Sequence, residues 1–207
     1  MIANKKQSQL KALPEDTATF FKKLSGYDTL RYILCDRAFL VEGPCDALII
    51  ERAYKDKWGK YPADEGYDII EVGTSFSRFL ELAESLKIET TIVTDNDGKP
   101  EALNAKYAKY NNCSHITICY EPEAIELPEN LKGSLEENYN YNTLEPCLYR
   151  SNGASKLCEI LEISNESETH LLKYMKRNKT DCALKEEKRF CSRDLWRERS
   201  YRCASSM

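Results

Sequence analysis

The stretch RAFLVEGPCD, residues 37–46, decides how the chain folds, together with TTIVTDNDG at residues 90–98. In both stretches a short apolar and β-branched run stops abruptly at carboxylates. These carboxylates are Glu42, Asp46, Asp95 and Asp97. Apolar runs of this length, bounded by turn residues, are typical of strands buried on both faces of a parallel sheet. Ligands of open α/β sheets bind beyond the carboxyl ends of the strands, so we expect the four carboxylates to share one crevice.

The rest of the chain up to residue 120 alternates strands with helices. Strands are predicted at 37–41, 67–72, 90–93 and 115–119, and helices over 17–35, 45–58, 76–86 and 100–110. This alternation predicts an α/β fold, a doubly wound, Rossmann-like parallel sheet of about four strands flanked by helices on both faces.

The pattern changes after residue 120. A polar loop with no core element is expected over 121–142, followed by short helices at 143–150, 154–161, 168–177 and 180–190. We therefore divide the chain into a helical lead-in (1–35), an α/β core (36–120) and a C-terminal part of loop and helices (121–207) that completes the site.

The composition excludes several classes of protein. The chain is 42% hydrophobic and 31% charged, which is typical of a globular domain. No run approaches roughly 18 uncharged apolar residues, and no signal-peptide core precedes the first helix, so no membrane partner is expected. Nine cysteines form no CxxC pair and only two histidines are present. We expect free thiols in a reducing cytoplasm rather than a zinc site.

The charge is unevenly distributed along the sequence. The net charge of −4 divides into −10 over residues 1–172 and +6 over residues 173–207. An acidic body with a basic end fits a carboxylate metal site beside a phosphate-binding surface. A basic helix that faces only solvent explains the same distribution equally well.

The chemistry of the four carboxylates points to a cation. Placed at neighbouring strand ends they would repel one another, and a divalent ion removes that repulsion. Ligand sets made only of oxygen favour Mg²⁺, Mn²⁺ or Ca²⁺. Either acidic stretch alone is a common turn, and it is their occurrence at two strand ends that favours the metal site. The chain has no G-x-G-x-x-G and no P-loop motif, so we expect no dinucleotide or ATP site in it.

A family resemblance rests on these same motifs. A strand ending in Glu-Gly, an Asp four residues after that Glu, and a later strand ending in Asp-x-Asp resemble the Toprim fold shared by topoisomerases, primases and certain nucleases. Longer stretches resemble the Toprim half of the OLD (overcoming lysogenization defect) family of ATP-dependent endonucleases. These stretches are LSGYDTLR at 24–31, FLVEGPCDALIIERAY at 39–54, DIIEVGTSFSRFLELA at 68–83, IVTDNDG at 92–98, NTLEP at 142–146 and YMKRNKTDCAL at 174–184.

The resemblance implies a Mg²⁺- or Mn²⁺-dependent endonuclease domain that nicks or cleaves DNA with two ions. Glu42, Asp46, Asp95 and Asp97 match the metal-binding carboxylates of the family, and Glu42 could be a ligand or the general base. The resemblance assigns Glu145 to the second metal and Lys179 to the scissile phosphate. Taken alone, Glu145 is an acid favoured in a first helical turn, and Lys179 is one lysine of a basic run.

The resemblance leaves partners and alternatives open. In the family, an ATPase half with a P-loop precedes this region, so possible partners besides DNA are an ATPase domain or subunit, or a second copy. One alternative is a non-catalytic interaction subunit that docks on such an ATPase through the apolar segment around Phe20, Phe21 and Tyr27. Another is a Toprim enzyme of primase or topoisomerase type, disfavoured because zinc-ribbon cysteines and a nucleophilic tyrosine context are missing from the sequence.

Overall fold

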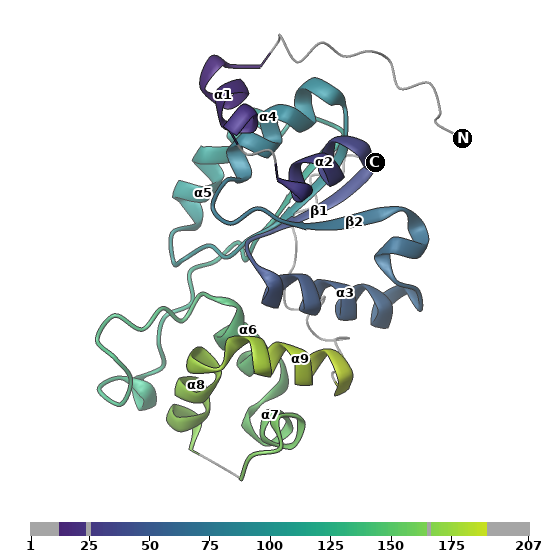
Figure 1. Cartoon of the computed structure of the whole chain (residues 1–207). Helices are drawn as coiled ribbons and strands as arrows, with labels where there is room; N and C mark the ends of the chain where they lie inside the picture. The colour runs from purple at the N-terminus through teal and green to yellow at the C-terminus, as the bar shows by residue number, and fades with distance from the viewer. Residues whose placement is uncertain (1–12, 24–25, 165–166, 190–207) are drawn as a thin grey trace.

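The computed structural model describes residues 13–23, 26–164 and 167–189 (Figure 1). The start of the predicted lead-in and the basic run beyond residue 189 lie outside these residues. The helices are α1 (Glu15–Lys23), α2 (Tyr27–Leu34), α3 (Pro44–Trp58), α4 (Phe76–Leu86), α5 (Pro100–Tyr107), α6 (Leu144–Asn152), α7 (Ala154–Leu161), α8 (Glu168–Arg177) and α9 (Lys179–Arg189). The strands are β1 (Arg37–Val41), β2 (Tyr67–Glu71), β3 (Glu89–Val93) and β4 (Ile116–Cys119). Short 3₁₀ turns are η2 (Pro62–Glu65), η3 (Ala108–Tyr110) and η4 (Glu129–Leu131).

The four strands form the parallel sheet that the sequence predicts, in the order β2-β1-β3-β4. In the register of β1, Leu40 pairs with Ile70 on one side and with Ile92 on the other. The chain leaves β1 for β2 on one side and then crosses back to place β3 on the other side. The direction of winding therefore reverses between β1 and β3, which is the position where α/β sheets bind ligands.

Both faces of the sheet are buried, because alternate residues of each strand enter different cores. Ala38 and Leu40 of β1 join a core with α2, α4 and α5, whereas Phe39 and Val41 pack against α3. The predicted arrangement of helices on both faces is confirmed.

Helix α3 also packs against the C-terminal helices. Its residues Ile49 and Ala53 join a second core formed by α6, α7, α8 and α9. The fully buried members from these helices include Leu157, Leu171 and Met175. Helix α3 thus lies between the sheet and the helices of residues 144–189 (Figure 1). The helix that follows Glu42 is thereby fixed on two sides.

The segment 121–142 differs from the prediction. It carries η4 and four buried side chains, and these pack against Leu172 of α8. The four are Leu131, Leu135, Tyr139 and Tyr141. The prediction of a polar loop without a core element was wrong, because these apolar residues follow neither a strand period nor a helix of useful length.

The half-buried His115 gives the fold a pH dependence. Burial lowers the pKa of His115, the charge of Lys87 lowers it further, and its Nε2 atom is buried without a hydrogen-bond partner. A group whose pKa is lower in the folded chain costs stability as the pH falls from about 6.5 toward the folded pKa. We expect the free energy of unfolding to fall less between pH 7.5 and pH 5 in His115→Gln than in the wild type, measured by urea titration. His170→Gln, on the exposed side of α8, is the control, and parallel curves for wild type and His115→Gln would contradict the expectation.

Candidate metal and nucleic-acid site

The carboxyl ends of β1 and β3 bring the two acidic stretches to one edge of the sheet. Leu40 pairs with Ile92, so the same register brings Glu42 level with Thr94, one residue before Asp95. Neighbouring strands lie only about 4.8 Å apart. The two stretches, which are about 50 residues apart in the sequence, therefore meet at the reversal point of the sheet.

The first stretch exposes one carboxylate and anchors the other. The side chain of Glu42 is exposed at the end of β1, and its carbonyl oxygen accepts a hydrogen bond from the Gly73 N–H (3.1 Å). Helix α3 begins with Pro44, where no N–H is needed. In its first turn Asp46 accepts a hydrogen bond from the Gly43 N–H through Oδ2 (3.1 Å). The Asp46 carboxylate is thereby oriented at the positive end of α3.

The second stretch is a tight turn held by Asn96. This side chain is buried and donates hydrogen bonds to the carbonyl oxygens of Glu121 and Glu123, both at 2.8 Å. Asp95, on one side of it, accepts a hydrogen bond from the Leu144 N–H through Oδ2 (3.2 Å). Asp97, on the other side, is exposed and accepts a hydrogen bond from Asn140 Nδ2 (2.8 Å).

In an extended backbone, Asp95 and Asp97 would project in the same direction, because they are two residues apart. The backbone is not extended at Asp97, which has a φ of 50° in the left-handed region. Both carboxylates nevertheless bind donors from residues 140–144. Residues 140–144 thus hold the acidic turn of residues 95–98 in place through these hydrogen bonds.

Glu145 and Lys179 form an ion pair across two helix starts. Glu145 lies in the first turn of α6 and is only 5% exposed. Its Oε1 atom lies 2.8 Å from Lys179 Nζ, and its Oε2 atom accepts a hydrogen bond from Thr143 Oγ1 (3.1 Å). Lys179 is the first residue of α9, where the helix dipole disfavours a cation. Its ammonium group is stabilised there by the carboxylates around it.

The pKa values of Lys179 and Cys45 are shifted by the charges around these two side chains. Burial lowers the pKa of Lys179, but the hydrogen bond to Glu145 and the charges of Glu145 and Asp95 outweigh it and raise the pKa above its usual value. Burial raises the pKa of Cys45, and the charges of Asp46 and Glu145 add to this. Glu145 thus acts on both groups, Asp95 acts on Lys179 and Asp46 acts on Cys45, whereas the side chain of Asp97 is exposed.

The donor chemistry of this edge suits a hard divalent cation, since every candidate ligand offers carboxylate oxygen. In residues 13–23, 26–164 and 167–189, however, no group of three or more His, Cys, Asp or Glu side chains is arranged to hold a metal ion. Asp46, Asp97 and Glu145 are each hydrogen-bonded or paired to a donor of the protein instead. The residues therefore fit the ion in kind, through their carboxylate oxygens, whereas the described side chains are not gathered around one position.

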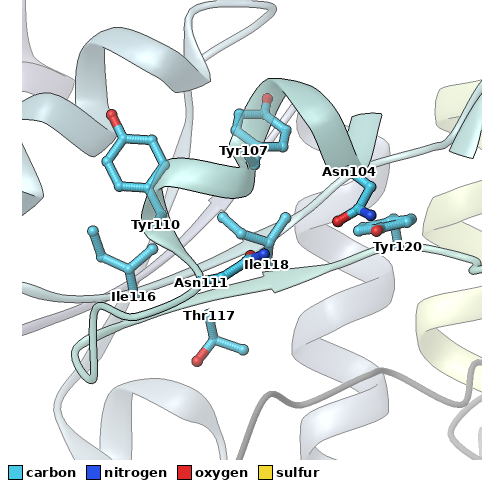
Figure 2. A pocket seen from close by; sticks show the side chains of 8 residues that line it. All are labelled: Asn104, Tyr107, Tyr110, Asn111, Ile116, Thr117, Ile118 and Tyr120. Atoms are coloured by element: carbon cyan, nitrogen blue, oxygen red, sulfur yellow. The ribbon is translucent and has the colours of Figure 1, made fainter. Parts of the chain in front are cut away.

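A small cavity lies beside the acidic turn of residues 95–98, and a larger one lies elsewhere in the sheet domain. One of about 10 Å³, enough for about one water molecule, is lined by Asp95, Asn96, Thr143 and Arg150 among others. Another of about 230 Å³ lies between α5 and the edge strand β4, where Tyr107 and Asn104 face Ile118 and Tyr120 (Figure 2). The larger cavity contains none of the six candidate residues, so it is separate from the carboxylate site.

Three positioning residues escaped the sequence prediction. Asn96 holds the acidic turn, Asn140 binds Asp97, and Asn142 bonds both the N–H and the carbonyl of Ile125 (2.7 and 3.0 Å). The only signal for these residues in the sequence is a local excess of asparagine, which a loop explains as well.

The fold and the site define a Toprim-type α/β domain: a parallel sheet with acidic strand ends at its reversal point. Residues 33–97 match the family model described as "Overcoming lysogenization defect protein-like, TOPRIM domain". This segment is an OLD-like Toprim domain, as the sequence predicted. It contains Glu42, Asp46, Asp95 and Asp97, whereas Glu145 and Lys179 lie outside the matched residues. No curated protein matches the chain.

Membership of this class carries general properties. Toprim domains act on nucleic acids and bind divalent metal ions, so this chain contains a domain of a nucleic-acid-acting, metal-dependent class. None of the described helices has the length and apolar character needed to cross a membrane.

Proposed function

We propose that the chain is a Mg²⁺- or Mn²⁺-dependent endonuclease domain that nicks DNA, related to the OLD family. One observation carries the proposal: Asp95 bonds the backbone of Leu144 next to Glu145, and Glu145 pairs with Lys179 of α9. The register of β1 and β3 brings Glu42 to the same edge of the sheet. We propose further that residues 121–207 complete the site of the core formed by residues 36–120.

The proposed ligands are Glu42, Asp46, Asp95, Asp97 and Glu145, which would hold two ions. Bound ions would activate water and neutralise charge on the phosphodiester. Glu42 is exposed, so it can either bind an ion or accept a proton from water at its carboxylate. Asp46 and Asp95 are held by backbone N–H groups, which fixes the direction from which they can bind.

Lys179 is the proposed catalytic cation. Its side chain is about half exposed, so its ammonium group can reach a phosphate while one of its donors stays on Glu145. The raised pKa keeps it protonated at neutral pH. A fixed positive charge at this position would stabilise the charge that develops on the phosphoryl oxygens.

The test is nicking of supercoiled plasmid by the purified chain. We expect open-circular product with Mg²⁺ or Mn²⁺ and none with EDTA, and the activity should return when the ion is restored. Nicking should also fall steeply with added salt, because phosphate contacts release counterions. Nicking that persists in EDTA would overturn the assignment.

One observation favours a second candidate, a non-catalytic subunit that binds an ATPase partner. Tyr27, Leu30 and Leu34 form an exposed apolar stripe on α2, with exposures of 77%, 57% and 72%. The rest of the predicted docking segment does not support it, because Phe20 and Phe21 pack on the core, with Phe21 in edge contact with Phe79 (5.1 Å). A partner-dependent subunit would not nick DNA alone, so the plasmid assay separates the two candidates.

A further inference from the structure

A basic surface at the end of α8 borders the carboxylate site. Helix α8 ends with Lys176 and Arg177, and α9 begins at Lys179 after the single residue Asn178. Arg177 and Lys179 are two residues apart, so their Cα atoms lie at most about 7.6 Å from each other. All three cationic residues are exposed. We name the side chains of Lys176 and Arg177 the α8 basic surface.

A carboxylate of the protein pairs with this surface. Lys176 Nζ lies 2.6 Å from Glu136 Oε2 and 5.2 Å from the centroid of the Tyr139 ring. The hydrogen bond and the charge of Lys176 lower the pKa of Glu136, and the charge of Arg177 lowers it further. Glu136 thus supplies a negative charge that both cations of the α8 basic surface stabilise.

The short segment that carries Glu136 also reaches the carboxylate site. Asn140, four residues further on, donates a hydrogen bond to Asp97 (2.8 Å). Tyr139 is only 9% exposed, so the segment is anchored between these two contacts. Burial raises the pKa of Tyr139, and the charge of Glu145 adds to this. The segment therefore contacts α8 at one end and a proposed metal ligand at the other.

The pair of Lys176 and Glu136 can exchange its carboxylate for a phosphate. The two side chains are 43% and 62% exposed, and an exposed ion pair of this kind contributes little stability because water and salt screen it. A DNA phosphate offers an oxyanion of the same charge, and its binding releases counterions from the DNA. Arg177 adds a planar guanidinium group, which can bind two phosphate oxygens at once. Because Tyr139 anchors the segment, only the Glu136 side chain has to move away.

We propose that Lys176 and Arg177 bind DNA backbone phosphates beside the one that faces Lys179, and that Glu136 holds their position until DNA displaces it. The choice of DNA rests on the proposed function. Glu136 then competes with DNA for Lys176, and this competition lowers the affinity of the chain. Phosphate contacts carry no sequence information, so the surface would position the strand without reading its bases.

The first test looks for a gain of affinity, which a misfolded variant cannot imitate. The probe is a short fluorescein-labelled DNA duplex, titrated in EDTA so that no cleavage occurs and followed by fluorescence anisotropy. Glu136→Gln should tighten binding about 2- to 5-fold, as expected when one exposed ion pair no longer competes. Glu137→Gln is the matched control, because it makes the same charge change at the neighbouring exposed residue, and it should tighten binding less. Unchanged affinity of Glu136→Gln, or equal tightening by both variants, would overturn the competition.

A double-mutant cycle assigns this gain to Lys176. Adding Glu136→Gln to Lys176→Ala should no longer tighten binding, because the competing pair is already broken. A gain that persists without Lys176 would overturn the displacement of Glu136.

Salt titration tests the phosphate contacts themselves. Lys176→Ala/Arg177→Ala should reduce the salt dependence of log K by about 1.8, as expected for two phosphates of a duplex. Lys156→Ala is the matched control, because Lys156 is a 48% exposed lysine of α7, and it should leave the salt dependence unchanged. A wild-type salt dependence in the double variant would overturn the α8 basic surface. Thermal melting checks that each variant is folded.

The outcomes separate this proposal from the proposed function. The expected changes in affinity and salt dependence, without any plasmid nicking, support the α8 basic surface and remove the nuclease. Metal-dependent nicking together with an unchanged salt dependence of Lys176→Ala/Arg177→Ala overturns the surface and leaves the nuclease in place.

Discussion

An Asp95→Ala variant is expected to nick supercoiled plasmid at least about 100-fold more slowly than the wild type, since even groups that only orient metal ligands contribute about 10- to 100-fold. Asp95 is central to the cluster, because it binds the backbone of Leu144 and its charge acts on Lys179. Its loss removes a ligand and loosens the junction between the acidic turn and α6. The rate of open-circle formation in Mn²⁺ is the measurement.

Asp95→Asn separates the two effects of that change. An asparagine oxygen can still accept the hydrogen bond from the Leu144 N–H, but it lacks the charge that holds a cation. We expect Asp95→Asn to melt near the wild-type temperature and to nick as slowly as Asp95→Ala. Glu159→Ala is the matched control, because Glu159 is a 74% exposed carboxylate on α7 that pairs with Lys156. A rate within twofold of wild type in either Asp95 variant would remove Asp95 from the site.

The second large effect is expected at Lys179. Lys179→Met keeps the length of the side chain and removes its charge, and we expect nicking to fall about 100- to 1000-fold, as when one preorganised donor to a developing negative charge is lost. The same change leaves the Glu145 carboxylate buried, with the hydroxyl of Thr143 as its remaining side-chain donor. This should lower the free energy of unfolding by about 1–3 kcal/mol. The half-exposed position of Lys179 favours the lower end of that range.

A double-mutant cycle distinguishes catalysis from structure at this pair. In Lys179→Met/Glu145→Gln the buried charge is gone, so urea titration should recover much of the lost stability. Nicking should not recover, because no cation faces the phosphate. Recovery of nicking along with stability would show that neither Lys179 nor the Glu145 carboxylate takes part in the chemistry.

The sequence predicted the regular part of the fold well because its periodicity was unambiguous. The predicted bounds of α4, α7 and α8 coincide with the structure, and the four strands lie where the apolar runs are. Helix α3 begins one residue earlier than predicted, at Pro44, which is a favourable first helical residue. Such elements are determined by local residue patterns, and these patterns can be recognised in the sequence alone.

The site was only partly accessible to the same reasoning. Two acidic strand ends in a parallel sheet have to share an edge, so the proximity of Glu42 and Asp95 follows from topology. The pairing of Glu145 with Lys179 depends on how α6 and α9 pack around α3, and no residue pattern encodes that packing. Those two residues were indicated by the family resemblance alone. Asn96 and Asn142 were missed because their partners are backbone groups of a loop without a period.

The position of Lys179 at the start of α9 also orders events during synthesis. Asp95 leaves the ribosome 84 residues before Lys179, which at about 5–20 residues per second is an interval of roughly 4–17 s. During that interval the newborn polypeptide presents acidic groups whose own neutralising lysine has not yet been made. Activity that depends on this lysine would thus be withheld until the start of α9 has been synthesised.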